Sequence, residues 1–230
     1  RFQLFFNRDE RRTRKPALPP QRRSKSGTSF LAPLDGDFGG SWIGVNEFGL
    51  ALCLLNGYSP RDRDDGGPPD GFTSRGLLLT ALIDSSSVSQ SLRRLRRFEH
   101  ARFRSFVLAA FEPPGAAALA AWDRRELSVT SGSLGVVPMP LISSSFRTEE
   151  VRRGRRRLLE RMRQDPAGEP TRLHLAYHAS HEPSRGPPSV CMHRPDASTV
   201  SFSRIVVDPE SVRFHYAPHS PCRGVLDGSC

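Results

Sequence analysis

The feature that most constrains this sequence is a succession of short apolar runs, each bounded by glycine, proline or polar residues. They predict a hairpin within residues 39–56, an extended segment at 136–143, and strands at residues 2–6, 103–111, 116–122, 126–130, 190–193, 200–208 and 212–216. Apolar residues at helical spacing predict helices at residues 75–83, 88–98 and 148–163. This order of elements favours an α+β layered fold with mainly antiparallel sheets.

The hairpin within residues 39–56 has the clearest local signal. Two apolar runs flank a turn at residues 46–49, where Gly49 can adopt a positive φ. Ser74 and Ser87 stand where helix N-caps are expected, since a serine oxygen can accept from the first free amides of a helix. Clusters of proline, glycine and charged residues predict loops at residues 11–30, 59–72 and 164–188.

Length and composition exclude several classes of protein. The chain has 230 residues, 37% of them hydrophobic, so it can bury a core. Its apolar runs are far shorter than the roughly 18 residues that a membrane span needs. The net charge is +10, yet only Lys15 and Lys25 are lysines among the 34 basic residues. The arginine runs at residues 93–97 and 152–157 fit solvated helix faces, and no RNA-binding motif is present, so nucleic acid is not a favoured partner.

Cysteine usage points to a reducing compartment. Four cysteines are too few for a disulfide scaffold in a chain of this length. Cys53 and Cys191 lie in apolar runs and are expected to be small buried side chains. The sequence does not decide whether Cys222 and Cys230, both in the tail, are paired. We therefore expect a cytoplasmic location.

A group of histidines suggests a metal site that the spacing does not support. The candidate ligands are His174, His178 and His181, with Cys191 or His193. The first two would share a face of a helix, but the segment continues into a proline-containing loop. The spacing matches no common zinc site, so we expect loop histidines, no metal and no cofactor.

Three segments together resemble the NRDE family, to which transport and Golgi organisation protein 2 belongs. The first is Asn-Arg-Asp-Glu at residues 7–10, at the end of an apolar strand. The second is Gly-Gly-Ser-Trp-Ile-Gly-Val-Asn at residues 39–46, followed by an apolar strand that ends at Asn56. The third, residues 189–208, is similar to the closing hairpin of the family. The resemblance covers most of the chain and implies a single domain over residues 1–230.

The resemblance also implies the four-layer αββα sandwich of N-terminal-nucleophile hydrolases. In such enzymes an N-terminal cysteine thiol attacks an amide, and its own α-amino group, with an ordinary pKa of about 7.7–8.0, serves as the base. None of residues 1–6 is Cys, Ser or Thr, and Arg1 is not a start residue. We therefore expect that the sequence lacks the first residues of the domain and the nucleophile with them.

The resemblance makes Asn7, Arg8, Asp9 and Asn56 the candidate catalytic residues. An arginine lowers the pKa of a neighbouring thiol and an aspartate can accept from an ammonium group, which are roles that fit Arg8 and Asp9. Asn7 is a candidate hydrogen-bond donor, and Asn56 is a candidate oxyanion or substrate contact. Plainer alternatives stay open: Arg8 and Asp9 can form a structural ion pair, and Asn56 can be an ordinary turn residue.

Three functions remain possible from the sequence. The first is hydrolysis of a non-peptide C–N amide bond through an N-terminal cysteine that is absent from this chain. The alternative is a non-enzymatic binding or trafficking protein on the same fold, with the Golgi organisation and haem or lipid handling that the resemblance to animal relatives implies. In both cases the expected partner is an unidentified small-molecule ligand or substrate. The third, a basic RNA-binding protein, would show steeply salt-dependent binding.

Overall fold

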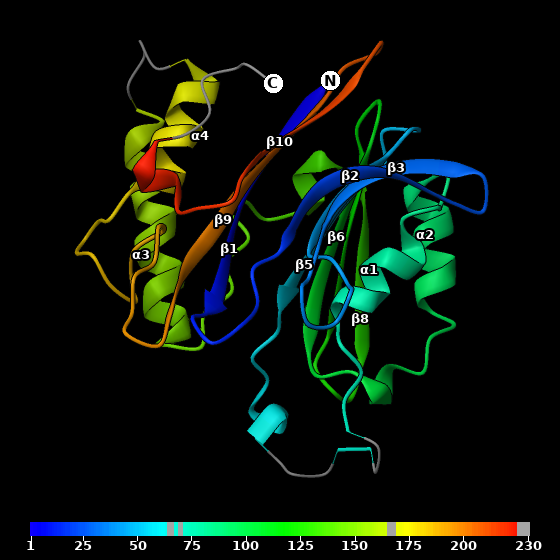
Figure 1. Cartoon of the computed structure of the whole chain (residues 1–230), viewed down its shortest axis with the longest axis horizontal. Coiled ribbons are helices and arrows are strands. Elements are labelled where there is room, and N and C mark those ends of the chain that lie inside the picture. The colour runs from blue at the N-terminus through cyan, green and yellow to red at the C-terminus, as the bar shows by residue number, and fades with distance from the viewer. Residues whose placement is uncertain (64–66, 69–70, 165–168, 225–230) are drawn as a thin grey trace. The chain divides into compact units, whose positions relative to one another are not determined.

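Two sheets organise the chain, one of seven strands and one of three (Figure 1). The computed structural model describes residues 1–63, 67–68, 71–164 and 169–224. The chain divides into two units. The first contains residues 1–2, 16–138 and 206–212, and the second contains residues 3–15, 139–205 and the described residues from 213 onward. Each unit is assembled from segments that are far apart in the sequence, and the single domain expected over residues 1–230 stays a prediction.

The sheet of the first unit has the strand order β2-β3-β4-β5-β6-β7-β8, and all neighbouring strands are antiparallel. Its strands are β2 (Leu18–Lys25), β3 (Thr28–Leu34), β4 (Ile43–Asn46), β5 (Ala51–Asn56), β6 (Phe106–Glu112), β7 (Ala116–Trp122) and β8 (Leu127–Ser133). Strands that are adjacent in the sheet follow one another along the chain, so the sheet needs no crossover. The strands predicted within residues 103–130 are confirmed, with end points shifted by a few residues.

The loop predicted at residues 11–30 is wrong, because β2 and β3 pair as a hairpin there. Its turn is made by Ser26 and Gly27, which adopt positive φ angles of 49° and 82°. Pro19 and Pro20 fall where the pairing register shifts, on an edge strand of the sheet. A missing amide donor costs little at such a position, so the prolines are compatible with a strand.

The hairpin predicted within residues 39–56 is confirmed by the pairing of β4 with β5. Gly49 has a φ of 76°, as the turn requires. Asn46 holds the turn, because its Oδ1 accepts from the backbone amides of Phe48 and Leu50, both at 3.1 Å. The asparagine of the second motif is therefore a structural residue of the hairpin.

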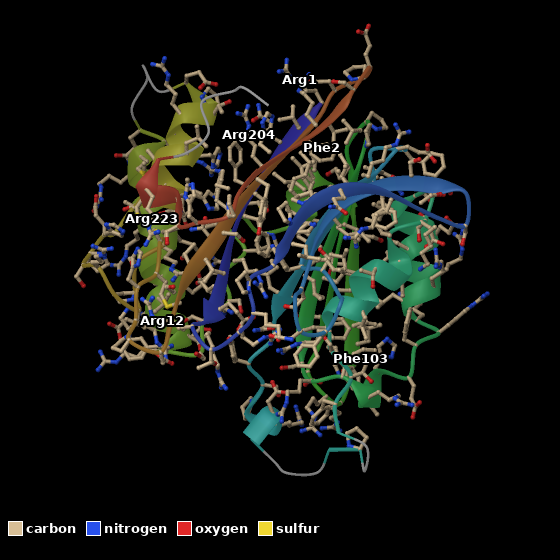
Figure 2. The ribbon with its side chains drawn as sticks, in the orientation of Figure 1. Arg1, Phe2, Arg12, Phe103, Arg204 and Arg223 are labelled. Atoms are coloured by element: carbon tan, nitrogen blue, oxygen red, sulfur yellow. The ribbon has the colours of Figure 1, made fainter. Side chains whose placement is uncertain are left out.

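Helices α1 (Gly76–Leu82) and α2 (Val88–Leu95) cover one face of this sheet. The N-cap predicted at Ser87 is confirmed, since its side chain accepts from the amide of Gln90. The cap predicted at Ser74 is wrong, because α1 begins at Gly76 without a side-chain cap. Phe103, labelled in Figure 2, packs edge-on against Phe98 and Phe106 in the core that the helices share with the sheet.

The backbone of the second motif lies very close to the start of α1. A Cβ atom added at Gly40 would lie 2.4 Å from the carbonyl carbon of Gly76. The amide of Ser41 donates to the Gly76 carbonyl at 3.1 Å. Only a residue without a side chain allows this approach, which explains the glycine at position 40.

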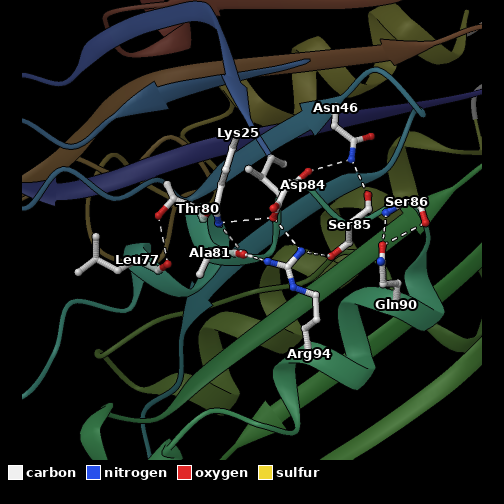
Figure 3. Close-up of polar contacts among 11 residues, drawn as sticks. Lys25, Asn46, Leu77, Thr80, Ala81, Asp84, Ser85, Ser86, Gln90 and Arg94 are labelled. Atoms are coloured by element: carbon white, nitrogen blue, oxygen red, sulfur yellow. Dashed lines mark hydrogen bonds and ion pairs between the residues drawn. The ribbon is translucent and has the colours of Figure 1, made fainter. Parts of the chain in front are cut away.

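A polar network closes the other end of α1 (Figure 3). Lys25 Nζ donates to two carbonyls of the last turn at 2.9 and 2.8 Å, and Asn46 Nδ2 donates to two carbonyls just beyond it at 2.8 and 2.7 Å. The Asp84 side chain is 7% exposed there and forms an ion pair with Arg94 at 2.7 Å. These donors satisfy carbonyls that a helix end leaves free, and so they connect three segments of the first unit.

The sheet of the second unit has the order β1-β9-β10. Its strands are β1 (Phe2–Arg11), β9 (Ala197–Val207) and β10 (Val212–Ala217). Gln3 contacts Arg204 and Asp9 contacts Thr199, so β1 and β9 run antiparallel. The strands predicted at residues 200–208 and 212–216 are confirmed, and a turn joins them in which the Asp208 amide donates to the Ser211 carbonyl at 2.9 Å.

Two helices belong to the second unit, α3 (Thr148–Met162) and α4 (Pro170–Ala179). The first was predicted, but the second lies in a segment predicted as loop, and that prediction is wrong. Glu169 caps α4 by accepting from the amides of Thr171 and Arg172, both at 2.9 Å. Proline at the first position suits a helix start, because no amide is needed there. The helices share a small core with Val190.

The remaining segments are irregular. The strand predicted at residues 190–193 is wrong, since the described segment forms one isolated bridge, from His193 to Ser198. The segment predicted as extended at 136–143 begins in a short helix and continues without pairing in the described structure. Residues 64–66 and 69–70 of the predicted loop at 59–72, and Cys230, lie outside the described residues. Short 3-10 helices are η1 (Pro60–Arg63), η2 (His100–Arg102), η3 (Leu134–Val136) and η4 (Pro221–Arg223).

The α+β class with antiparallel sheets is confirmed, and each unit supplies one sheet with helices packed beside it. In the part of the chain that the structure describes, no helix has both the length and the apolar character to cross a membrane.

Candidate functional site

The motif at residues 7–10 lies on β1, where successive side chains point to opposite faces. Phe5, Asn7 and Asp9 share the face that contacts α4, β9 and the segment before β9. Arg8 lies on the other face with Glu10. The two residues expected to act together, Arg8 and Asp9, are thus neighbours in sequence on opposite faces of the strand.

Asn7 uses its whole amide group inside the second unit. Its Nδ2 donates to the backbone carbonyls of His178 at 2.9 Å and Val190 at 3.1 Å. Its Oδ1 lies 3.1 Å from Nδ1 of His178. Because both amide protons are already donated, Oδ1 must be the acceptor and the histidine carries its proton on Nδ1. Asn7 therefore joins β1 to α4 and to the segment before β9.

His178 is neutral in this arrangement. Burial, with the nearby charges of His174 and Arg155, lowers the pKa of His178 to about 3. The Phe5 ring stacks on both histidine rings, with centroids 5.0 Å from His174 and 6.0 Å from His178. The two histidines considered as metal ligands from the sequence are therefore packed against an aromatic ring of β1.

Asp9 is an exposed carboxylate that is held from one side. Thr199 Oγ1 donates to Asp9 Oδ1 at 2.6 Å, and the amide of Met192 donates to the same Oγ1 at 2.8 Å. Burial of the surroundings raises the pKa of the Asp9 carboxyl, while the charge of Arg155 and the Thr199 hydrogen bond lower it in part. By its accessible surface the residue as a whole is exposed. No residue in the described ranges bonds to Oδ2.

Arg155 supports this face from α3. It is buried, and its guanidinium donates to the carbonyls of Pro188 at 3.2 Å and Ser189 at 2.5 Å. The run at residues 152–157 was predicted as a solvated face, and for Arg155 that prediction is wrong. The sequence does contain a signal that Arg155 is buried. Val151 and Leu158 lie one turn before and one turn after it, so the three residues share one face of the helix.

Arg8 is buried and forms an ion pair with Glu10, in which Arg8 Nη2 lies 3.2 Å from Glu10 Oε2. Its charge reaches Tyr216 on β10, where it lowers a tyrosine pKa that burial raises. The guanidinium is therefore fixed at the end of β1, on the face opposite Asp9.

Asn56 belongs to the first unit. It is the last residue of β5, paired with Phe106, and its side chain is exposed. Asn56 therefore stands at the end of β5. One further backbone hydrogen bond links the residues next to the paired ends of β5 and β6, from the Gly57 amide to the Ser105 carbonyl at 3.0 Å.

Possible metal ligands gather elsewhere in the second unit. His181, Cys191 and His193, all considered from the sequence, lie together with Cys222, which was not. Sequence reasoning also missed Thr199 as the partner of Asp9, since nothing in a sequence without relatives marks a threonine 190 residues away.

Comparisons with known proteins identify a family. Residues 1–216 match the model of the family described as Transport and Golgi organisation 2. No similar protein is found among curated sequences.

Three solved structures are similar to this chain at low sequence identity. Penicillin V acylase from Agrobacterium tumefaciens has a TM-score of 0.47 and 14% identity, over 94% of this chain and 82% of its own. A mutant of conjugated bile acid hydrolase from Clostridium perfringens has a TM-score of 0.45 and 11% identity, over 94% and 83%. Another variant of that hydrolase has a TM-score of 0.48 and 13% identity, over 99% and 87%.

Proposed function

This chain belongs to the Transport and Golgi organisation 2 family, and from that premise we propose that it is an amide hydrolase of the N-terminal-nucleophile kind, acting on a non-peptide C–N bond. The observation that supports the proposal is the Asp9 carboxylate. Asp9 is exposed, Thr199 fixes its Oδ1, and its Oδ2 accepts no hydrogen bond from a described residue. A carboxylate oriented in this way suits an ammonium group, either the α-amino group that serves as base or a cationic part of the substrate.

The residues of the motif divide between two roles in this proposal. Asp9 contacts the reacting groups, and Asn7 is a positioning residue because both of its amide protons are committed to backbone carbonyls. Arg8 fixes the strand end through its ion pair with Glu10, on the face opposite Asp9. Asn56 stays a candidate oxyanion contact, since an exposed amide at a strand end can donate to a developing negative charge.

The reaction needs a nucleophile, which the proposal assigns to an N-terminal cysteine outside the printed residues. Its thiolate would attack the amide carbonyl carbon, the α-amino group would take the thiol proton and return it to the leaving amine, and water would then release the acyl group. Sequencing the N-terminus of the protein from its native source tests this assignment. A mature chain that begins with Cys supports it, and one without Cys, Ser or Thr at its start overturns the hydrolase proposal.

A matched pair of variants tests the role of Asp9 in the native-length protein. We expect Asp9→Asn to lower kcat/KM for amide hydrolysis by about 10²-fold, because the substitution keeps the shape and removes the charge. Asp196→Asn is the control, since Asp196 is an exposed aspartate of the same unit that pairs with Arg194 at 2.7 Å. Equal activity of the two variants would contradict the role of Asp9. Alkylation of the N-terminal thiol should abolish the same activity.

The alternative is a non-enzymatic binding or trafficking protein, which the transport function in the family description favours. The Asp9 carboxylate would then hold a cationic ligand that is not hydrolysed. Binding that Asp9→Asn weakens, without turnover in the native-length protein, would favour this alternative over the hydrolase.

A further inference from the structure

Two histidines and two cysteines converge in the second unit from three separate segments. His181 follows α4, Cys191 and His193 precede β9, and Cys222 lies in η4. One donor atom from each residue can be chosen so that all four lie within 4.8 Å of one another. This set contains two sulfurs and two nitrogens, which is a common ligand set of structural zinc sites.

The distances at His193 fit a tetrahedral zinc site. Its Nε2 lies 3.5 Å from the sulfur of Cys191 and 3.5 Å from the sulfur of Cys222. Zinc–sulfur bonds of about 2.3 Å and zinc–nitrogen bonds of about 2.0–2.1 Å, at tetrahedral angles, place nitrogen and sulfur about 3.5 Å apart. Both sulfurs therefore stand at the separation from this nitrogen that a shared ion would impose.

His181 provides an independent sign that the cluster is incomplete without a ligand. Its Nε2 is buried and has no hydrogen-bond partner among the described residues. Its ring centroid lies 5.1 Å from that of His193, at an interplanar angle of 69°. A buried imidazole nitrogen without a partner is costly, and coordination to a metal would satisfy it.

We propose that His181, Cys191, His193 and Cys222 bind one zinc ion as a structural site. Four protein ligands fill a tetrahedral shell and leave no position for water or substrate, so the ion stabilises the fold and does not catalyse. The site would join the end of α4, the segment before β9 and η4 into one cross-link within the second unit.

Hydrogen bonds hold the segment that carries two of the ligands. Cys191 and His193 are two residues apart in the irregular segment before β9, and His193 forms an isolated bridge with Ser198. The Cys191 amide donates to the Ser180 carbonyl at 2.9 Å, and Ser189 Oγ donates to the Cys191 carbonyl at 2.7 Å. The segment is therefore fixed on both sides of the first cysteine.

The charges around the cluster are compatible with a zinc site. Zinc with two thiolates and two neutral imidazoles has no net charge, so neighbouring cations do not oppose its binding. Arg12 and Arg223, both labelled in Figure 2, and Arg185 are cations close enough to His193 to interact with it electrostatically.

The site connects to the motif through one threonine. The Met192 amide donates to Thr199 Oγ1, and the Thr199 amide donates back to the Met192 carbonyl, both at 2.8 Å. The same Oγ1 donates to Asp9. Zinc would thus fix the segment that orients the Asp9 carboxylate, although the zinc proposal does not depend on the hydrolase proposal.

The test is zinc content and cobalt spectroscopy of the full chain. Protein produced with zinc and purified under reducing conditions should hold one zinc per chain. Cobalt substitution should give the visible bands of tetrahedral Co²⁺ and near-ultraviolet thiolate-to-cobalt charge transfer. Cys222→Ser and His181→Gln should lose the bound metal and the bands. Cys53→Ala and His215→Gln should retain both, because these residues lie outside the cluster.

Other outcomes would overturn the proposal. One is substoichiometric zinc in wild-type protein that is folded by circular dichroism. Another is unchanged metal content in Cys222→Ser and His181→Gln. A third is an intact mass that shows a disulfide between Cys191 and Cys222 in metal-supplied, reduced protein, since oxidised sulfurs cannot act as thiolate ligands. The wild-type measurement decides the case even if a ligand variant does not fold.

Discussion

Asn7 and His178 are joined by two hydrogen bonds although 171 residues separate them in the sequence. Asn7 Nδ2 donates to the backbone carbonyl of His178 at 2.9 Å, and the histidine Nδ1 donates to Asn7 Oδ1 at 3.1 Å. The first bond fixes the backbone at the end of α4 against β1, and the second fixes the tautomer of the ring. Because the ring is packed as a neutral group, this pair makes the stability of the second unit depend on pH.

The pH dependence follows from the direction of the pKa shift. The folded-state pKa of His178 is about 3, below the ordinary value of 6.5. Between these values the unfolded chain binds the proton and the folded chain does not, so the free energy of unfolding decreases as pH falls. We expect His178 to contribute up to about 1.4 kcal/mol per pH unit in this window.

Denaturant unfolding between pH 7 and pH 3 measures this contribution. His178→Gln should lower stability at pH 7 and show a shallower loss below pH 6.5 than the wild type. His219→Gln is the control, because it removes a histidine that lies outside the contacts of Asn7 and His178. Parallel curves for the wild type and His178→Gln would contradict the assignment.

Replacing the Asn7 amide with a carboxylate tests its two donor bonds. Asn7→Asp would place negative oxygens against the carbonyls of His178 and Val190, so we expect a loss of about 3 kcal/mol in the free energy of unfolding. Asn56→Asp makes the same chemical change at an exposed strand end, where solvent reaches the new carboxylate, and should reduce stability by less than Asn7→Asp does. Equal effects of the two substitutions would show that Asn7 has no structural role.

Replacing glycine by alanine should have opposite effects on stability at two positions. Gly40→Ala should destabilise the protein by about 2 kcal/mol, because the new Cβ would lie 2.4 Å from the backbone of Gly76. Gly154→Ala should stabilise it by about 0.5–1 kcal/mol, because Gly154 lies within α3 with open space around it. Thermal melting of both variants checks the pair, and a neutral Gly40→Ala would contradict the close approach of the second motif to α1.

Asp9→Asn should separate function from stability. Since the folded-state pKa of Asp9 is raised, its ionised form costs stability above that pKa, and the cost disappears as pH falls below the unfolded value. The asparagine keeps an acceptor for Thr199, so we expect unchanged or higher thermal stability at pH 7 together with lost activity. A clear decrease in the melting temperature at pH 7 would indicate a structural role for the carboxylate.

The sequence correctly predicted elements that depend on interactions between residues close together in the chain. The turn at residues 46–49 and the cap at Ser87 are set by residues within four positions of each other, and both are confirmed. The hairpin of β2 and β3 was missed because prolines normally indicate loops, and only its edge position makes them acceptable. Helix α4 was missed because glycine and proline surround it, although Glu169 and Pro170 form a recognisable start.

The sequence by itself determined the α+β class, the hairpin turn at residues 46–49 and the candidate motif at residues 7–10, because these depend on periodicity and on turn chemistry within short windows. The tertiary structure decided which side chains contact one another. It placed Arg8 and Asp9 on opposite faces, assigned Thr199 to Asp9, and brought Cys222 to His181, Cys191 and His193. Such partners are separated by up to 190 residues, so only the way the chain folds back can bring their side chains within bonding distance.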